Sequence, residues 1–254
     1  MFKKVVKIFP LLLLSIWSAA SAMAQEAEAV LQRSPDFKDY DSQIVKKIPI
    51  PKGYHEGLLV EGADIWVTNG KGIKTWIVDK TNGSVKSELA GAAGFTEGIT
   101  RMPDGTYLTA DWEEKKIFRV RIMDNRMFPV GERSVDPAFP AGVLWNGSRL
   151  YVVTWTRGMG TKFNLLEMDE KFNVIRRVSI PHIQEPAHLA WDGMYLWISS
   201  WYQKTVYKVD PNSWTILGQV RSPVSKATGI AWDGRYLWLT GTYSDLYQLQ
   251  VEGY

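Results

Sequence analysis

Two glutamates occupy equivalent places in a sequence that repeats. Glu56 stands before Gly57 in the segment Tyr-His-Glu-Gly-Leu, and Glu97 stands before Gly98 in the segment Phe-Thr-Glu-Gly-Ile-Thr. A carboxyl group in a pocket can take a proton from one reacting group and return it to another, so both are candidates for general acid–base chemistry. A glutamate at a strand start can also serve only to bind backbone amides of a neighbouring unit. For Glu56 the sequence leaves both roles open.

A second set of candidates is polar or aromatic and lies at the predicted end of the second strand of each repeat. Antiparallel pairing places this end beside the start of the first strand, so the two sets should converge on one concave site. With Glu97 as the catalytic candidate, the candidates for substrate binding are Glu56, Asp111, Trp112, Trp155, Trp201, Thr242 and Tyr243, together with His188, which replaces a glycine of the repeat.

Structural roles compete with binding for the aromatic candidates. Trp155 and Trp201 can pack between neighbouring repeats as readily as they can line a pocket. The chain has three scattered histidines and no cysteine. We therefore expect neither a metal site nor a disulfide, and we expect no cofactor.

The elements that position these residues recur along the chain. The repeat is clearest at 227–250 and 186–202, where both segments contain Ala-Trp-Asp-Gly before an apolar strand, and weaker copies begin at 140, 95 and 54. A period in the forties with short strands inside each unit is typical of β-propeller blades. The anchor positions are separated by 41, 44, 46 and 41 residues and are Gly57, Gly98, Gly142, His188 and Gly229.

Turn residues punctuate the same repeats. Asp-Gly or Asn-Gly pairs supply the positive φ angles that tight hairpins need. The aspartates resemble calcium ligands in type, but a turn explains each of them and they are spread one to a repeat. The glycines for which we predict positive φ are Gly105, Gly147, Gly193 and Gly234.

The predicted fold class is all-β, as a five-bladed β-propeller at 42–254 with four antiparallel strands in each blade. The last repeat stops after its third strand, and 43–50 alternates like a fourth strand, so the N-terminal strand should close the ring and remove an open edge. A glycine-rich insertion at 156–162 is a candidate lid or rim. The predicted blades cover 53–91, 94–132, 138–181, 184–222, and 226–254 completed by 42–51.

The segment before the repeats has a different composition. Three lysines precede an apolar run at 8–17, and Ala-Met-Ala at 22–24 is a small-residue cleavage pattern, so 1–24 is predicted to be a secretory signal peptide. The apolar run is too short to span a membrane. Polar residues without a strand pattern make 25–41 a predicted tail or arm on the surface.

Charge and export limit the partners. The formal charge of +3 comes from the three lysines of the signal peptide, so the remaining chain has 27 basic and 27 acidic residues and is neutral. A neutral chain gives no electrostatic reason to expect nucleic acid or an anionic membrane as a partner. We expect a secreted or periplasmic monomer that binds a small molecule or a peptide N-terminus.

Several motifs resemble those of propeller-type glutaminyl cyclotransferases of plants and bacteria, over about 43–251. The segment 95–100 is similar to the second-blade motif of that family, Phe-Gly-Glu-Gly-Ile/Leu-Thr. The segments 237–242 and 246–249 are similar to its last-blade motifs, Leu-Phe-Val-Thr-Gly-Lys and Leu-Tyr-Glu-Ile. The resemblance implies a five-bladed ring, with Glu97 as the proton-transfer residue and Trp201 in the substrate pocket. The implied reaction cyclises an N-terminal glutamine to pyroglutamate and releases ammonia.

Three positions depart from the family pattern. Thr242 stands where the family has lysine, Glu56 where it has glutamine, and Asp111 where it has tryptophan. The changes remove a positive charge and add negative ones, which raises the pKa of a nearby Glu97 and disfavours an oxyanion. The rim cations Lys71, Arg157 and Lys162 are candidate replacements, and Thr242 could still donate a weaker hydrogen bond.

Two other functions therefore stay open. The first is a non-catalytic exported propeller that binds a small molecule, a peptide or a protein at its axial mouth. The second is a carbohydrate site, with Glu56 and Glu97 as a carboxylate pair and tryptophans as platforms for sugar rings.

Overall fold

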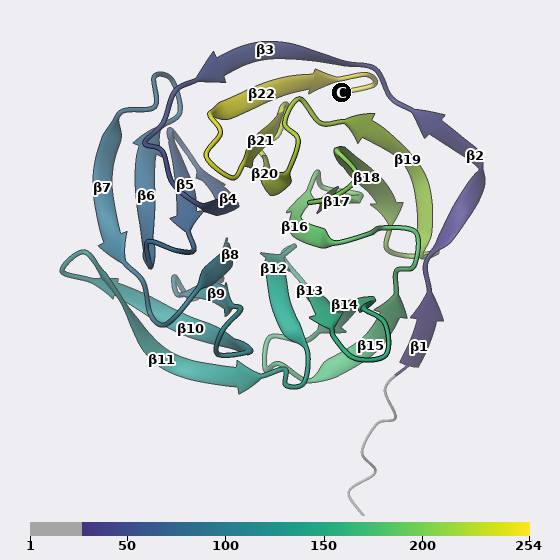
Figure 1. The fold of residues 1–254 in the computed structure, drawn as a ribbon, viewed down its shortest axis with the longest axis horizontal. Helices are drawn as coiled ribbons and strands as arrows, with labels where there is room; N and C mark the ends of the chain where they lie inside the picture. The colour runs from purple at the N-terminus through teal and green to yellow at the C-terminus, as the bar shows by residue number, and fades with distance from the viewer. Residues whose placement is uncertain (1–26) are drawn as a thin grey trace, which may run out of the picture.

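The computed structural model describes residues 27–254 (Figure 1). The predicted signal peptide, 1–24, lies outside the described residues. The described chain is all-β, with 22 strands in four sheets. No helix within it is long and apolar enough to cross a membrane.

Eight strands form one sheet in the order β4-β5-β6-β7-β11-β10-β9-β8. Its two halves, β4 to β7 and β8 to β11, are each antiparallel, and a single parallel pair, Ala90 with Arg126, joins them. The strands are β4 (His55–Glu61), β5 (Asp64–Asn69), β6 (Lys74–Asp79), β7 (Val85–Ala90), β8 (Thr96–Arg101), β9 (Tyr107–Asp111), β10 (Lys116–Met123) and β11 (Arg126–Ser134).

Two sheets contain five strands each, and both include a strand from the N-terminal segment. The first has the order β1-β15-β14-β13-β12 and the second the order β16-β17-β18-β19-β2. The strands are β1 (Ala27–Val30), β12 (Phe139–Trp145), β13 (Leu150–Thr156), β14 (Lys162–Met168) and β15 (Val174–Ser179) in the first, and β2 (Gln32–Asp39), β16 (Pro186–Trp191), β17 (Leu196–Ser200), β18 (Thr205–Asp210) and β19 (Thr215–Arg221) in the second.

The last sheet joins the two ends of the repeat region. β3 (Ser42–Ile48) pairs antiparallel with β22 (Leu246–Val251), next to β21 (Leu237–Gly241) and β20 (Ala227–Trp232). This is the pairing that the sequence predicts between the early strand and the incomplete last repeat.

The N-terminal segment differs from the prediction. It lies on the surface as an arm, but it is not free of strands, because β1 pairs parallel with β15 and β2 pairs parallel with β19 (Figure 1). Both strands add to an outer sheet edge, where only occasional side chains need to be apolar. Leu31 is fully buried between them, which explains why no alternating pattern marked the segment.

The innermost strands surround a central axis (Figure 1). β4, β8, β12, β16 and β20 contact one another in a closed cycle. The anchor glycines permit this approach. A Cβ on Gly98 would stand 2.7 Å from the backbone nitrogen of Val143, and one on Gly57 would stand 2.7 Å from the carbonyl oxygen of Glu97.

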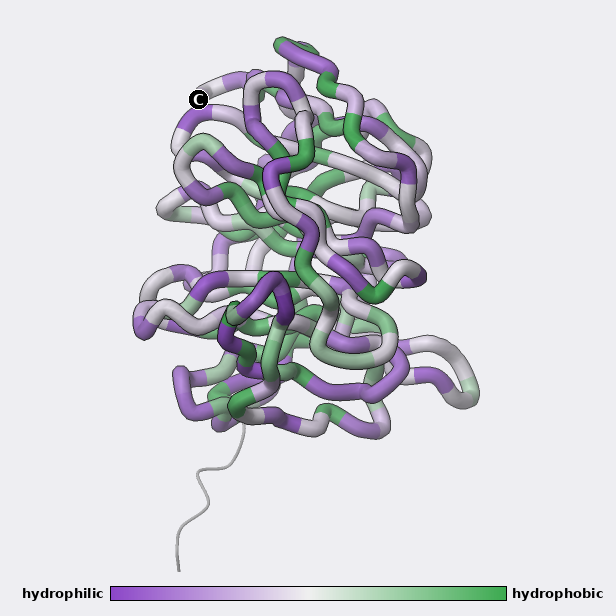
Figure 2. Tube along the Cα trace, turned by 90° about the vertical axis from the view of Figure 1, so that its left-hand side faces the viewer, coloured by the Kyte–Doolittle hydropathy of each residue, from purple (hydrophilic) through white to green (hydrophobic). Residues whose placement is uncertain are grey.

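Apolar side chains pack into five buried clusters. Figure 2 shows many hydrophilic residues at the turns and hydrophobic ones along the strands of the interior. The repeated aspartates also fix buried tryptophans. Asp192 accepts the indole N–H of Trp197 at 2.8 Å, and Asp233 accepts that of Trp238 at the same distance. The four turn glycines predicted to have positive φ do so, with values from 81° to 103°.

Candidate active site

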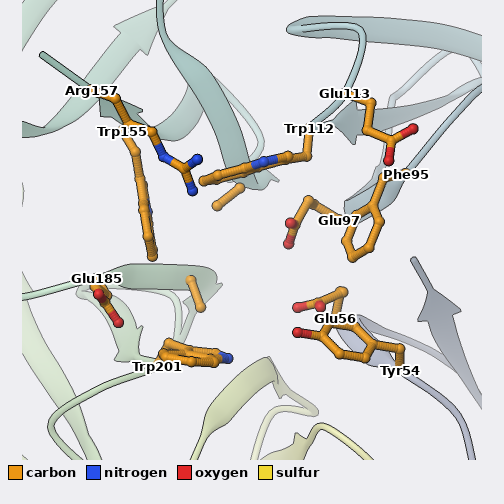
Figure 3. Close-up of a pocket in the computed structure, with 12 residues that line it drawn as sticks. Tyr54, Glu56, Phe95, Glu97, Trp112, Glu113, Trp155, Arg157, Glu185 and Trp201 are labelled. Carbon is orange, nitrogen blue, oxygen red and sulfur yellow. The ribbon is translucent and has the colours of Figure 1, made fainter. Parts of the chain in front are cut away.

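A pocket of about 460 Å³ opens at one mouth of the central axis (Figure 3). Its lining comes from the starts of the innermost strands and from the ends of the second strands or the turns that follow them. This is the convergence that the topology predicts. The lining consists of Tyr54, Glu56, Phe95, Glu97, Trp112, Glu113, Ala141, Trp155, Arg157, Glu185, Ala187 and Trp201.

Glu56 and Glu97 place their carboxyl groups side by side in this pocket (Figure 3). Glu56 is buried and shares a side-chain hydrogen bond with Glu97. Burial, the charge of Glu97 and this hydrogen bond raise the pKa of Glu56 well above its ordinary value. Burial also raises the pKa of Glu97 to about 8; the hydrogen bond from Glu56 lowers it and the charge of Asp111 raises it. The pair therefore retains a proton near neutral pH, which suits a proton-transfer role.

A threonine on the adjacent strand fixes the backbone of Glu97. The hydroxyl of Thr68, on β5, accepts a hydrogen bond from the N–H of Gly57 at 2.6 Å and donates one to the carbonyl of Glu97 at 2.5 Å. Thr68 is fully buried. It therefore connects the starts of β4 and β8, the two strands that carry the glutamates.

Tryptophans form the walls opposite the glutamates. The ring of Trp155 meets that of Trp112 edge-on, with centroids 5.1 Å apart, and its indole N–H donates to the carbonyl of Pro186 at 2.7 Å. The backbone N–H of Trp201 donates to the carbonyl of Glu185 at 2.8 Å. Three of the predicted pocket tryptophans are therefore held by the fold with their faces toward the cavity (Figure 3).

One cation lines the pocket. The guanidinium of Arg157 lies 5.3 Å from the ring centroid of Trp112 and 5.2 Å from that of Phe139, a range in which cations are attracted to aromatic faces. Arg157 belongs to the insertion predicted at 156–162, which thus contributes to the rim. Of the other predicted rim cations, Lys71 lies 4.4 Å from the ring centroid of Tyr54, a lining residue, and its charge acts to lower the pKa of Glu56. Lys162 lines a neighbouring pocket.

Two predicted residues stand behind the pocket and do not line it. Asp111 is buried, and its carboxylate accepts the backbone N–H of Glu114 at 2.9 Å. Its effect on Glu97 is electrostatic. His188 is buried on the axis, where its Nδ1 donates to the carbonyl of Ile230 at 2.9 Å, and burial lowers its pKa to about 4. A neutral, buried imidazole of this kind cannot serve as a base in the pocket.

Thr242 and Tyr243 also lie outside the pocket lining. Tyr243 has φ of +58° and donates its N–H to the carbonyl of Gly53, which directs the chain to the surface. Its ring contacts Tyr54 edge-on, and Tyr54 lines the pocket in its place. The hydroxyl of Thr242 is buried without a hydrogen-bond partner in the described part of the chain.

The pocket also contains Tyr54, Phe95, Glu113 and Glu185, which are not among the predicted site residues. A signal for three of them was present, since Tyr54, Phe95 and Glu185 each stand three positions before an anchor. Glu113 follows Trp112 in the turn after β9. Among residues 27–254 no three potential ligand side chains are grouped to hold a metal ion.

The comparisons with known proteins show the fold. No family model matches the sequence, and no curated protein sequence does. Among solved structures, the chain is similar to a glutaminyl cyclase of Myxococcus xanthus, with a TM-score of 0.67, 14% identity, and coverage of 85% of this chain and 98% of that one. It is also similar to the PQQ-bound aldose sugar dehydrogenase of Streptomyces coelicolor, with a TM-score of 0.54, 12% identity and coverage of 84% and 99%.

A third similar structure is the Cps50 (Swd1) β-propeller domain of Myceliophteria thermophila, with a TM-score of 0.51, 12% identity and coverage of 83% and 99%. At these identities the likeness shows a β-propeller fold.

Proposed function

We propose that this protein cyclises an N-terminal glutamine, in a peptide or a small molecule, to pyroglutamate with release of ammonia. The observation that carries the proposal is the glutamate pair. Glu56 and Glu97 share a hydrogen bond, and burial raises both of their pKa values, within a pocket walled by three tryptophans. The structural likeness to a glutaminyl cyclase supports the same conclusion.

The reaction needs one group to move a single proton. The neutral α-amine of the substrate attacks its own γ-carboxamide carbon, and the carboxylate of Glu97 takes a proton from the amine nitrogen. Glu97 then returns this proton to the carboxamide nitrogen, the C–N bond breaks and ammonia leaves. A group with a pKa near the working pH performs both steps well.

Arg157 is our proposed replacement for the lysine that the family carries at Thr242. The tetrahedral intermediate bears a negative oxygen, which needs a donor or cation near it. Arg157 is the cation that lines the pocket, whereas Thr242 lies outside. In Figure 3 its guanidinium points into the cavity beside Trp112.

Binding without reaction is the second candidate function. The pocket has four acidic residues and one basic residue among its aromatic walls, so it favours a cationic ligand whether or not chemistry follows. Glycoside cleavage is less well supported. A glycosidase places two carboxyl groups on either side of the bond that it cleaves, about 5 Å or more from each other. Glu56 and Glu97 are instead hydrogen-bonded to each other.

We further propose that the ring has five blades and that the protein is exported. The cycle of five innermost strands supports the count, with the eight-stranded sheet regarded as two blades joined by one residue pair. The composition of 1–24 supports export.

Product analysis separates the two candidate functions. A short peptide with N-terminal glutamine is incubated with the purified protein, and released ammonia and peptide mass are followed from pH 5 to pH 9. Ammonia release with loss of the same mass from the peptide is the expected result. Binding of the peptide without any ammonia at any pH would leave only the binding function.

A further inference from the structure

Glu185 lies across the pocket from the glutamate pair, and the proposed cyclisation does not use it. Figure 3 shows its carboxyl group beside Trp201, on the side opposite Glu56 and Glu97. One of its oxygens, Oε2, is buried and has no hydrogen-bond partner among residues 27–254. A carboxylate oxygen without a donor is costly, and because the side chain lines the pocket, this carboxyl group can take a donor from a bound ligand.

The backbone at Glu185 is strained and held in place. Its φ is +47°, a region that non-glycine residues seldom adopt. The flanking segment is fixed by the hydroxyl of Ser200, which donates to the carbonyl of Gln184 at 2.6 Å, and by the N–H of Trp201, which donates to the carbonyl of Glu185. Strain that the surroundings maintain in this way is characteristic of functional positions.

Two indole rings accompany the carboxyl group. Trp201 is tied to Glu185 through the backbone, and Trp155 is tied to the next residue, Pro186, through its indole N–H. The ammonium of Lys226 lies 3.9 Å from the ring centroid of Trp201, so this ring already attracts one cation. The carboxyl group of Glu185 and the ring of Trp155 offer a charge-assisted hydrogen bond and a cation–π contact to an ammonium or guanidinium group of a ligand.

Glu185 also marks the way out of the pocket. It lines the site with Glu97 and, at the same time, a neighbouring pocket whose lining includes Thr161, Phe163, Tyr202 and the basic Lys162. A peptide whose first residue reaches Glu97 would pass Glu185 if it continued toward this second pocket. The side chain that follows the first residue is then the one placed near Glu185.

We propose that Glu185, with Trp155 and Trp201, forms a subsite for a basic side chain at the second position of the substrate. The position number rests on the proposed cyclisation, whereas the preference for a cation rests on the subsite alone. The substrate class is thus a peptide that begins with glutamine followed by lysine or arginine.

The test compares Gln-Lys-Ala amide with Gln-norleucine-Ala amide, in which the second side chain keeps the butyl stem of lysine and lacks its ammonium group. With the unaltered protein we expect kcat/KM for ammonia release to be about tenfold higher for the lysyl peptide. Glu185→Gln should bring the ratio close to one. In Glu185→Lys we expect the preference to change sign, so that kcat/KM is higher for Gln-Glu-Ala amide than for the lysyl peptide. Glu132→Gln removes an exposed acidic group on the outer strand β11, away from the pocket, and should leave the ratio unchanged.

The outcomes separate this proposal from the proposed function. Equal turnover of the lysyl and norleucyl peptides would overturn the subsite and leave the cyclisation intact. If no peptide releases ammonia, the cyclisation fails, and binding measured by tryptophan fluorescence still tests the subsite. Tighter binding of the lysyl peptide that Glu185→Gln abolishes would then support it, and equal binding would overturn it. Melting curves of each variant show whether the fold is retained.

Discussion

The hydroxyl of Thr68 donates a 2.5 Å hydrogen bond to the backbone carbonyl of Glu97, so a residue of β5 positions the proposed catalytic residue at the start of β8. Ser199 makes the equivalent connection elsewhere in the ring. It accepts the N–H of His188 at 2.9 Å and donates to the carbonyl of Thr228 at 3.2 Å. A buried hydroxyl on a second strand therefore fixes the backbone carbonyl of Glu97 in one place and that of Thr228 in the other.

Removing the hydroxyl of Thr68 should reduce the rate of cyclisation by more than the accompanying loss of folding stability accounts for. In Thr68→Val the N–H of Gly57 loses its acceptor, at a cost of about 1–3 kcal/mol, and the start of β8 loses its tie. We expect kcat for peptide cyclisation to fall about tenfold, since small displacements of a catalytic group are costly. Ser199→Ala is the matched control and should lose similar stability with little change in kcat. Equal loss of kcat in both variants would mean that Thr68 only stabilises the fold.

The glutamate pair should make stability fall as pH rises. The pKa of Glu97 is about 8 in the folded protein against an ordinary value of 4.5, so between these values the folded state holds more protons than the unfolded state. The free energy of unfolding then decreases with rising pH through this window and levels off above it. Urea unfolding at several pH values should show this slope, reduced in Glu97→Gln and in Glu56→Gln. Slopes that match the unaltered protein in both variants would contradict the raised pKa values.

The close approach of the inner strands makes an anchor glycine sensitive to substitution. In Gly98→Ala the new Cβ would meet the backbone of Val143 at 2.7 Å, and relief requires a backbone shift. We expect a loss of about 1–3 kcal/mol in the free energy of unfolding. Gly158→Ala, where nothing lies within 4 Å of the added Cβ, should be close to neutral. Similar unfolding midpoints for the two variants would show that the strands have room to separate.

The N-terminal arm should contribute to stability through one side chain. Leu31 is fully buried among Val178, Ile180 and Ile216. Leu31→Ala should therefore lower the free energy of unfolding by about 2–4 kcal/mol. Val30→Ala, at a position that is 49% exposed, should have little effect. Denaturant titration of both variants measures the difference, and a neutral Leu31→Ala would show that the arm detaches without cost.

Much of the fold follows from local patterns in the sequence. The repeated Ala-Trp-Asp-Gly segments identify hairpins because glycine accepts positive φ, and the aspartates also bind the buried indoles of Trp197 and Trp238. The arm strands could not be predicted in this way. They pair with existing sheet edges, and few of their side chains are buried.

The candidate site was predictable where strand register determines it. Glu56, Glu97, Trp112, Trp155 and Trp201 meet in one pocket because each lies at a fixed end of a strand.

Loop conformations determine the rest of the site, and no strand pattern encodes them. Positive φ values at Glu185 and Tyr243 place the first in the pocket and the second outside it. His188 was misplaced for another reason: its imidazole binds the carbonyl of Ile230 along the axis instead of facing the mouth.

The central claim is that Glu97 moves the proton in glutamine cyclisation. The most direct measurement is the rate of ammonia release from a glutaminyl peptide by the unaltered protein and by Glu97→Gln, each corrected for spontaneous cyclisation. We predict release above the spontaneous rate that falls by a factor of about 10²–10⁴ in the variant. Release by Glu97→Gln at the rate of the unaltered protein would contradict the account.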